Sequence, residues 1–374
     1  METHMETDRM EIMYNKKPCY DIVYELSFDA LARELSALEV GQKRLCIITD
    51  STVERLYGKD LQAQLSGICK KVVLFSFPAG ESSKTLDTVK KAYEFLIQEG
   101  FDRKDLLLAL GGGVTGDLTG FVAATYLRGV DYVQIPTTLL AQADSSIGGK
   151  TGVDFDSYKN MVGAFKMPRL VYMNVSVLQT LEERQFYAGF AEIMKHGLIK
   201  DEAFYLWLLD NMYEICDRNP ETLKEMVFRS CLVKKQVVEK DPEEKGERAL
   251  LNFGHTIGHA IEKAKHFSLY HGECVALGAV AAAYISYRRG MLAMEEYYEI
   301  RDMFVPFNLP ISVEEINPDE IVRLTRSDKK MEAGRIKFVL LKKIGKAVID
   351  NTVTEQEILE AVNEIYFSER DAHE

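Results

Sequence analysis

Residues 105–121 read DLLLALGGGVTGDLTGF, and this stretch decides the fold of the first half of the chain. An apolar run ends in three glycines and a helical segment follows, which predicts a buried strand that turns directly into a helix. Gly111, Gly113 and Gly116 satisfy the pattern GxGxxG, in which bare backbone amides and a helix N-terminus face a pyrophosphate. The pattern alone is weak, because a tight structural turn explains the glycines equally well.

The acid that binds the ribose in such a fold usually lies about twenty residues further along the chain. Here that position falls near Asp131, which opens a predicted strand rather than closing one. Asp50, at the end of the apolar run RLCIITD, is better placed for this contact on geometric grounds.

The same alternation of short apolar runs and amphipathic segments extends over the first half of the chain. The runs RLCIITD, KKVVLFSFP, DLLLALGGG, DYVQIP and RLVYMN each end in turn, Gly, Pro or polar residues, which is typical of a parallel sheet with crossover helices. From about Val175 the pattern becomes helical, with one hairpin-like interruption at RIKFVLLKKIGKAVI. We therefore predict an α/β chain, with a Rossmann-like parallel-sheet domain over 1–174 and a mostly α-helical domain over 175–374. The opening METHMETDRM looks like a start-site or cloning remnant, so we exclude residues 1–10 from the fold.

Composition excludes several classes of function. The 374 residues carry a net charge of −12, which argues against nucleic acid or an acidic membrane surface as a partner. The longest nearly apolar run, 274–287, is too short to span a bilayer, and we expect no signal peptide. Six cysteines without a CxxC pair fit a reduced cytoplasm. We predict a cytoplasmic protein with a small-molecule substrate.

Three of the seven histidines stand close together, in LNFGHTIGHAIE (251–262) and HGECVALG (271–278). His255 and His259 are four residues apart in a segment that reads as helix, so both imidazoles project from one face. His271 follows nearby. A catalytic zinc takes three protein ligands from His, Asp or Glu and keeps one position open, so this face predicts a metal site. Ordinary, partly buried polar histidines are the alternative.

Six motifs together resemble the 3-dehydroquinate synthase family of sugar-phosphate cyclases, from Tyr20 to about Glu360. They are GGGVTGDLTGFVAATYLRG, IPTTLLAQADSSIGGKTGVD, AGFAEIMKHG, ERALLNFGHTIGHAIE, HGECVALG and SDKK, in that order. The combination is far more specific than any single motif. The resemblance implies that Glu192, His255 and His271 bind zinc, or cobalt in its place, and leaves His259 to contact the substrate phosphate and move protons.

The resemblance also implies that NAD is the dinucleotide. Its contacts would be Asp50, Glu81, Lys84, Gly112, Gly113, Val114, Thr115, Gly116, Asp117, Thr137, Thr138, Lys150, Lys159 and Thr180. The family's other catalytic groups correspond to Asp144, Lys150 and Lys195. The substrate-binding set would be Arg128, Asn160, Lys234, Arg248, Asn252, Lys329 and Lys330. In the family an arginine from the neighbouring subunit reaches the phosphate, which here is Arg128, so the resemblance implies a homodimer.

The implied reaction converts 3-deoxy-D-arabino-heptulosonate 7-phosphate to a carbocycle and inorganic phosphate. A carbon 5 alcohol is oxidised by NAD, phosphate is eliminated, carbon 5 is reduced again, the ring opens, and an intramolecular aldol step closes the carbocycle. Lysines and arginines would hold the carboxylate at one end of the substrate and the phosphate at the other.

Three alternatives remain open. A metal-dependent polyol or alcohol dehydrogenase would combine a GGG loop with histidine ligands but would accumulate NADH. A related cyclase of secondary metabolism would take a substrate without a carboxylate, for which Lys234, Arg248 and Asn252 have no use. A non-enzymatic binding protein is the third alternative, although no metal or cofactor position is missing.

Overall fold

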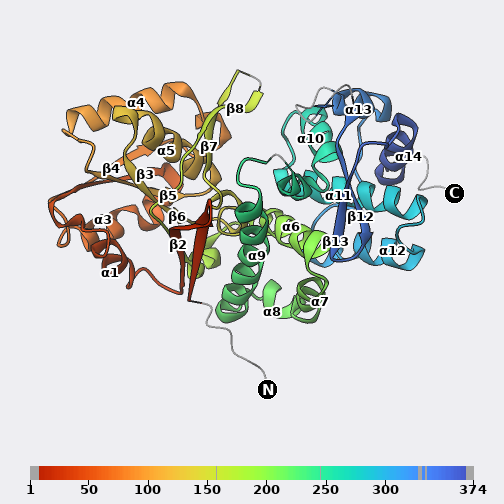
Figure 1. Cartoon of the computed structure of the whole chain (residues 1–374), viewed down its shortest axis with the longest axis horizontal. Coiled ribbons are helices and arrows are strands. Elements are labelled where there is room, and N and C mark those ends of the chain that lie inside the picture. Colours follow the sequence, from red (N-terminus) through yellow and green to blue (C-terminus); the bar gives the residue numbers. More distant parts are fainter. Residues whose placement is uncertain (1–7, 157, 245, 327–330, 333–334, 368–374) are drawn as a thin grey trace. The chain divides into compact units, whose positions relative to one another are not determined.

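The computed structural model describes residues 8–156, 158–244, 246–326, 331–332 and 335–367 (Figure 1). The chain divides into two compact units. The first consists of Met1–Leu181 with Pro220–Cys231, and the second consists of Glu182–Asn219 with Leu232–Glu374. The boundary that the sequence places after residue 174 stays a prediction.

The first unit is built on a seven-stranded sheet with the order β1-β2-β9-β6-β5-β3-β4. β1 is antiparallel to β2, and every other neighbouring pair is parallel, which confirms the predicted Rossmann-like sheet. The strands are β1 (Arg9–Tyr14), β2 (Lys17–Glu25), β3 (Arg44–Asp50), β4 (Lys71–Phe77), β5 (Leu106–Gly111), β6 (Asp131–Pro136) and β9 (Leu170–Asn174). A separate antiparallel hairpin consists of β7 (Lys150–Phe155) and β8 (Tyr158–Phe165).

Helices cover both faces of this sheet. Those of the first unit are α1 (Leu31–Ser36), η1 (Val40–Gln42), α2 (Ser51–Val53), η2 (Glu54–Gly58), α3 (Lys59–Leu65), η3 (Glu81–Ser83), α4 (Leu86–Gln98), α5 (Gly113–Thr125), η4 (Tyr126–Arg128), η5 (Ala141–Ser145) and η6 (Val175–Thr180).

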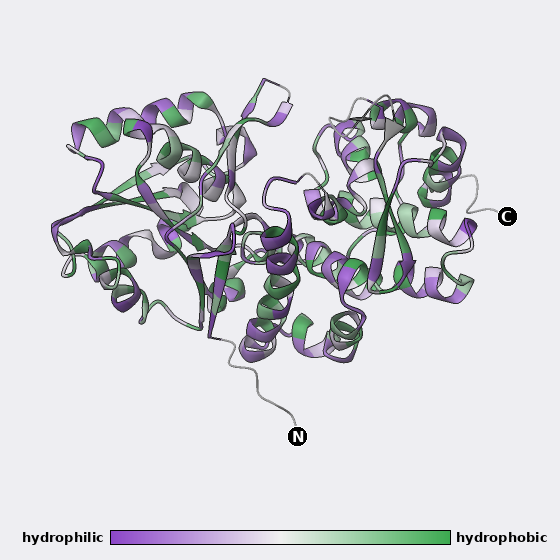
Figure 2. Ribbon diagram, viewed as in Figure 1, coloured by the Kyte–Doolittle hydropathy of each residue, from purple (hydrophilic) through white to green (hydrophobic). Residues whose placement is uncertain are grey.

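The side chains of β3 and β5 alternate between two hydrophobic cores. On one face Cys46 and Leu107 pack in a cluster with residues of α4 and α5, and on the other Ile47 and Leu108 pack with residues of α1 and α3. Strands buried on both faces read as continuous apolar runs, which explains why the sequence shows them so clearly. Hydrophobic and hydrophilic residues alternate around α4, as expected for a helix with one buried face (Figure 2).

The second unit is mostly helical. Its elements are α6 (Glu183–Lys200), α7 (Glu202–Asp210), α8 (Met212–Cys216), the later part of α9 (Pro220–Lys240), η7 (Glu247–Asn252), α10 (His255–Ala264), α11 (His271–Arg288), α12 (Met294–Asp302), η8 (Val305–Phe307), α13 (Pro318–Thr325), β10 (Met331–Glu332), β11 (Arg335–Ile336), β12 (Phe338–Lys343), β13 (Lys346–Asp350) and α14 (Glu355–Ile365). β12 and β13 pair antiparallel, so the predicted late hairpin is confirmed.

Glycines allow α6, α10 and α11 to approach one another at backbone distance. A Cβ atom on Gly272 would lie 1.7 Å from Ala188 O, and one on Gly278 would lie 1.8 Å from Gly254 O. Such close approach leaves no room for any side chain at these positions. The glycines thereby fix the places of the polar side chains that the three helices carry.

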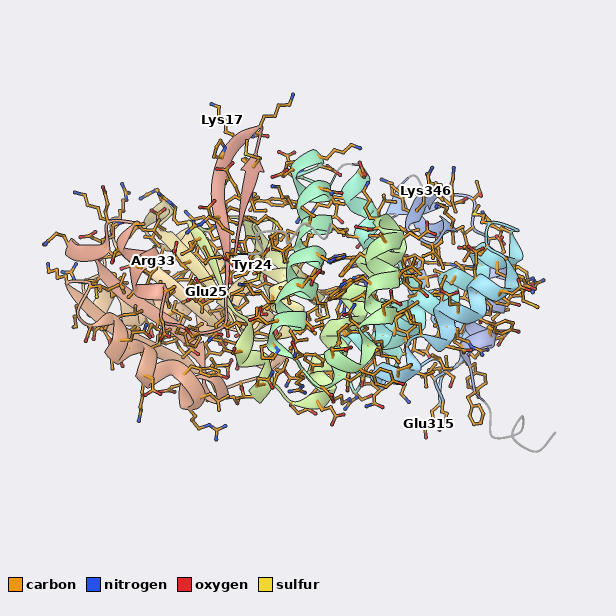
Figure 3. The ribbon with its side chains drawn as sticks, turned by 90° about the horizontal axis from the view of Figure 1, so that it is seen from below. Lys17, Tyr24, Glu25, Arg33, Glu315 and Lys346 are labelled. Atoms are coloured by element: carbon orange, nitrogen blue, oxygen red, sulfur yellow. The ribbon has the colours of Figure 1, made fainter. Side chains whose placement is uncertain are left out.

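Two sequence-based expectations about the first unit are wrong. Residues 9 and 10, which we had excluded, belong to β1, where Arg9 donates to Asp21. Figure 3 shows Lys17 at the tip of the resulting β1–β2 hairpin. The segment between the runs DYVQIP and RLVYMN, for which we predicted no strand, contains the β7–β8 hairpin, in which a Cβ on Gly163 would meet Thr151 O at 2.3 Å. The strands approach closely because of such glycines, and glycines hide the strand pattern in the sequence.

Within the described part of the chain, no helix combines the length and the hydrophobicity needed to span a membrane.

Candidate active site

The predicted dinucleotide contacts of the first unit follow the carboxyl ends of its parallel strands. β3 has β4 on one side and β5 on the other, so the chain reverses direction across the sheet at the ends of β3 and β5. Ligands of open α/β sheets bind at such a switch point. Asp50 is the last residue of β3 and Gly111 the last of β5.

The glycine loop after β5 has no room for side chains. A Cβ on Gly112 would lie 2.9 Å from Thr138 Cγ2, and one on Gly116 would lie 2.7 Å from Gln134 Oε1. Gly112 is the N-cap of α5, whose first backbone amides face away from the helix and favour an anion. The structure therefore gives Gly116 a packing role against β6 and places Gly112, which has no side chain, at the N-terminus of α5.

The side chain of Asp50 accepts hydrogen bonds from the backbone that follows it. Its Oδ1 accepts hydrogen bonds from Thr52 N at 2.9 Å and Val53 N at 3.1 Å, so it caps α2. Thr137 N donates to Gly111 O at 2.9 Å, which joins the ends of β5 and β6. The capping role does not exclude a ribose contact, because it uses only one carboxylate oxygen.

Lys84 ties three segments of the first unit together. Its buried ammonium group donates to Asp117 Oδ2 at 2.7 Å and to Asn160 Oδ1 at 2.5 Å. Burial alone would lower the pKa of Lys84, but Asp117 and Glu81 raise it above its ordinary value. Lys84 is thus a fixed cation, as a contact to a polyanionic cofactor requires.

The other predicted residues of the first unit lie on several elements. Glu81 is in η3, Asp144 in η5, Lys150 at the start of β7, Lys159 in β8 and Thr180 at the end of η6, where its hydroxyl lies 2.5 Å from Tyr57 OH. Arg128 is exposed at the end of η4 with φ of 68°.

In the second unit, α6, α10 and α11 bring the predicted metal ligands together. Glu192 Oε1 lies 3.5 Å from His255 Nε2 and 3.5 Å from His271 Nε2. Ligand atoms at about 2.0–2.1 Å from a tetrahedral zinc are about 3.3 Å from one another. The distance from Glu192 Oε1 to each of the two histidine nitrogens is thus close to the distance between two ligands of one ion.

The carboxylate of Glu192 is buried, and its two oxygens differ in their contacts. Its Oε1 makes no hydrogen bond within the described residues, while its other oxygen, Oε2, accepts from Lys195. A buried carboxylate oxygen without a hydrogen bond is costly, and a metal ion would satisfy it. Burial alone would raise the pKa of Glu192, but Lys195 and His271 lower it below its usual range.

Neighbouring groups orient both imidazoles towards Glu192. His255 Nδ1 lies 3.1 Å from Phe253 O, and His271 Nδ1 lies 3.8 Å from the buried Glu262. In each ring the Nδ1 side faces an acceptor, so Nε2 faces Glu192. Burial alone would lower the pKa of His271, but Glu192 and Glu262 raise it to about 9, which shows that these carboxylates favour a cation here.

His259 belongs to the same cluster. Donor atoms of His255, His259 and His271 lie within 4.8 Å of one another, so a set of three histidines is a second possible ligand group. The 3.5 Å distances from Glu192 to His255 and to His271 agree with the predicted ligand set, in which His259 is not a ligand.

The remaining predicted residues of the second unit are mostly buried. Arg248 is 3% exposed and donates to Pro242 O at 2.6 Å, and Lys234 is also buried. Asn252 donates to Glu244 Oε1 at 2.9 Å. Lys329 and Lys330 lie outside the described residues.

The sequence reasoning missed Glu262, whose carboxylate lies 3.8 Å from His271 Nδ1, and the pair Arg184 and Glu273 at the start of α11. Arg184 Nε donates to Glu273 Oε1 at 2.6 Å, and Glu273 Oε2 accepts from Tyr270 N at 2.7 Å. An acid at the third position of a helix is a capping signal, which identifies Glu273. No local pattern identifies Arg184, because its partner is on another helix.

Two family profiles match the chain. The profile described as 3-dehydroquinate synthase N-terminal matches residues 74–188, and the one described as 3-dehydroquinate synthase C-terminal matches residues 189–331. A 3-dehydroquinate synthase of Acetivibrio thermocellus is 41% identical over 343 residues, which is 92% of this chain and 95% of the relative.

Two solved structures are similar over 95% of this chain and 99% of their own chains. The 2-epi-5-epi-valiolone synthase ValA from Streptomyces hygroscopicus subsp. jinggangensis 5008, with NAD+ and Zn2+ bound, has a TM-score of 0.86 and 30% identity. A 2-deoxy-scyllo-inosose synthase complexed with carbaglucose-6-phosphate, NAD+ and Co2+ has a TM-score of 0.83 and 26% identity.

Proposed function

The chain belongs to the 3-dehydroquinate synthase family, and from that membership we propose that it converts 3-deoxy-D-arabino-heptulosonate 7-phosphate to 3-dehydroquinate and phosphate. This reaction is a step of the shikimate pathway, which leads to the aromatic amino acids. The observation that carries the proposal is the 3.5 Å separation of Glu192 Oε1 from both His255 Nε2 and His271 Nε2.

We propose Glu192, His255 and His271 as ligands of Zn2+ or Co2+. The bound ion would supply a Lewis acid that polarises the substrate alcohol. Lys195 holds Oε2 of Glu192 by an ion pair and so keeps Oε1 directed at the two histidines. His259, beside the ligands, is placed to hold or move a proton of the substrate.

We propose that NAD binds at the carboxyl ends of β3 and β5, where it would accept a hydride and return it within one catalytic cycle. The glycine loop 112–117 would take the pyrophosphate on the N-terminus of α5. Lys84, held between Asp117 and Asn160, would add a fixed positive charge. We also propose as NAD contacts the other residues predicted for it, namely Asp50, Glu81, Thr137, Thr138, Lys150, Lys159 and Thr180.

Cations would recognise the two anionic ends of the substrate. Lys234 and Arg248 are buried, and buried cations are stable only where anions or carbonyl groups compensate them. We propose Arg248, Lys234 and Asn252 for the carboxylate, and Lys150, Asn160, Asp144 and Lys195 as further substrate contacts. A fixed substrate lowers the entropic cost of the successive steps.

We also propose a homodimer in which Arg128 reaches the active site of the neighbouring subunit. Arg128 is exposed, and the adjacent Leu127 is an exposed large apolar side chain. A cytoplasmic location is proposed because all six cysteines are free thiols.

A cyclase that acts on a substrate without a carboxylate is the second candidate. It is favoured by the likeness to the valiolone synthase, at 30% identity. The higher identity to 3-dehydroquinate synthases, 41%, favours the acid substrate. A net dehydrogenase is disfavoured because both matching family profiles are described as 3-dehydroquinate synthase.

One assay tests the function directly. The purified chain, with substoichiometric NAD and one equivalent of Zn2+ or Co2+, is given the seven-carbon acid phosphate, and phosphate release is measured together with the cyclic product. We expect many turnovers per NAD. Release of phosphate only from a neutral seven-carbon sugar phosphate would favour the second candidate, and no release from either would contradict both.

A further inference from the structure

The N-terminus of α11 is held by a side-chain clamp on α6. Arg184 donates through Nε to Glu273 Oε1 at 2.6 Å and through Nη2 to Glu273 Oε2 at 2.8 Å. The same guanidinium group donates to Ser268 O at 3.3 Å and lies 4.6 Å from the ring centroid of Tyr270. One half-exposed arginine therefore contacts the last residues before α11 and the first turn of that helix.

Glu273 is also the helix cap. Its Oε2 accepts from Tyr270 N at 2.7 Å, so a single buried carboxylate binds both the arginine and the chain entering the helix. His271 and Gly272 are the two residues between Tyr270 and Glu273. Next to it, Gly272 packs against Ala188 of α6 so closely that no side chain fits.

We infer that Arg184 and Glu273 are positioning residues for His271, which set its distance from Glu192 and thereby the affinity of the metal site. Arg184 and Glu192 lie on the same helix, α6, so the bond from Arg184 to Glu273 fixes the start of α11 to the helix that carries the first ligand. The inference rests on the proposed function, because it takes His271 as a ligand.

The chain contains a matched control for this clamp. Arg289 donates to Glu357 through Nε at 2.6 Å and through Nη2 at 2.8 Å, and Glu357 Oε2 accepts from Thr354 N at 2.8 Å. Glu357 occupies the third position of α14 just as Glu273 does in α11. The two clamps have the same chemistry, but none of the proposed metal ligands lies on α14.

The test compares four variants of the full chain: Glu273→Gln and Arg184→Lys at the clamp, and Glu357→Gln and Arg289→Lys at the control. The Zn2+ dissociation constant is measured by competition with a chromophoric chelator, and the visible absorption of the Co2+ form reports ligand geometry. We expect the first two to weaken Zn2+ binding by about 10-fold, the lower end of outer-shell effects, and to shift the Co2+ bands. The control variants should leave both readouts unchanged.

Arg184→Lys keeps the test informative if Glu273→Gln does not fold, since Arg184 is half-exposed and lysine retains the charge while losing the two-pronged contact. The inference is overturned if the clamp variants bind Zn2+ like the wild type, or if all four variants weaken binding equally. His271→Ala is measured in the same series. If His271→Ala still binds Zn2+, the assignment of His271 as a ligand is refuted. If His271→Ala loses Zn2+ while Glu273→Gln and Arg184→Lys bind it like the wild type, only the positioning role of Arg184 and Glu273 is refuted.

Discussion

Oε1 of Glu192 lies 3.5 Å from Nε2 of His271, and the same oxygen makes no hydrogen bond among the described residues. The two side chains come from α6 and α11, which approach one another through Gly272. A buried anion aimed at an imidazole from a neighbouring helix is the arrangement that a cation stabilises.

His271→Ala should therefore lose metal and activity together while the fold survives. We expect metal affinity to fall by more than about 100-fold, beyond the usual effect of outer-shell changes. Metal content, phosphate release and circular dichroism measure the three properties. His266→Asn, at an exposed histidine with φ of 50°, is the control and should match the wild type. Stoichiometric zinc and full turnover in His271→Ala would contradict the assignment.

Much of the first unit could be predicted because its strands are buried on both faces. The predicted runs match β3, β4, β5, β6 and β9 to within two residues at each end. The β7–β8 hairpin could not be predicted, since its glycine contacts depend on pairing between two segments rather than on local propensity. β1 was not predicted, and its first two residues were excluded with the opening segment, which resembles a start-site remnant.

In the candidate site, too, local sequence patterns predicted some features, whereas those that depend on packing between helices could not be predicted. The helical spacing of His255 and His259 was visible in the sequence, and the structure places both on α10. The ligand role of Glu192 came only from the resemblance, because its proximity to the histidines depends on glycine-mediated packing of α6 and α11. Arg184 carried no local signal at all, since its bond to Glu273 joins two helices.

The close approach of α6 and α11 predicts the effect of a single methyl group. Gly272→Ala would place Cβ 1.7 Å from Ala188 O, a backbone atom that cannot rotate away. We expect the free energy of unfolding to fall by more than about 3 kcal/mol, the upper end of ordinary overpacking, with loss of metal binding. Unfolding in a denaturant measures the change in the free energy of unfolding. Gly67→Ala, whose Cβ would meet nothing within 4 Å, is the control; equal effects at both positions would exclude a packing role.

NAD should act as a recycled cofactor. If NAD returns the hydride to the substrate within each cycle, as proposed, many turnovers should proceed per NAD without net absorbance of the reduced nicotinamide. The measurement follows phosphate release and absorbance in one cuvette. Formation of one NADH per product would select the dehydrogenase alternative instead.

The pair Arg289 and Glu357 predicts part of the acid sensitivity of the fold. Hydrogen bonds from Arg289 lower the pKa of Glu357 from 4.5 to about 2. The folded state thus binds this proton less readily than the unfolded state, so the stabilisation is complete above pH about 4.5 and is lost as the pH falls towards 2. In urea unfolding at several pH values, Glu357→Gln should lose less stability over this interval than the wild type. Parallel curves for the two proteins would show that this pair contributes nothing to acid sensitivity.

Substitution of Arg248 tests whether the substrate carries a carboxylate. It is buried, and its Nη1 donates to Pro242 O, so a structural contribution accompanies any substrate contact. If its guanidinium group pairs with the substrate carboxylate, Arg248→Ala should lose about 2–5 kcal/mol of transition-state stabilisation, measured as kcat/KM. Arg248→Lys should restore only part, because a point charge cannot reproduce the planar two-pronged contact.

The structural contribution of Arg248 is separated by the choice of substrate. A neutral analogue without the carboxylate gains nothing from the guanidinium group, so wild type and Arg248→Ala should process it equally poorly, whereas a general loss of structure would lower its turnover in the variant as well. Unchanged turnover of the acid substrate by Arg248→Ala, or a preference of the wild type for the neutral sugar phosphate, would favour the cyclase of secondary metabolism. The carboxylate-dependent part of the loss is therefore the quantity that decides the substrate.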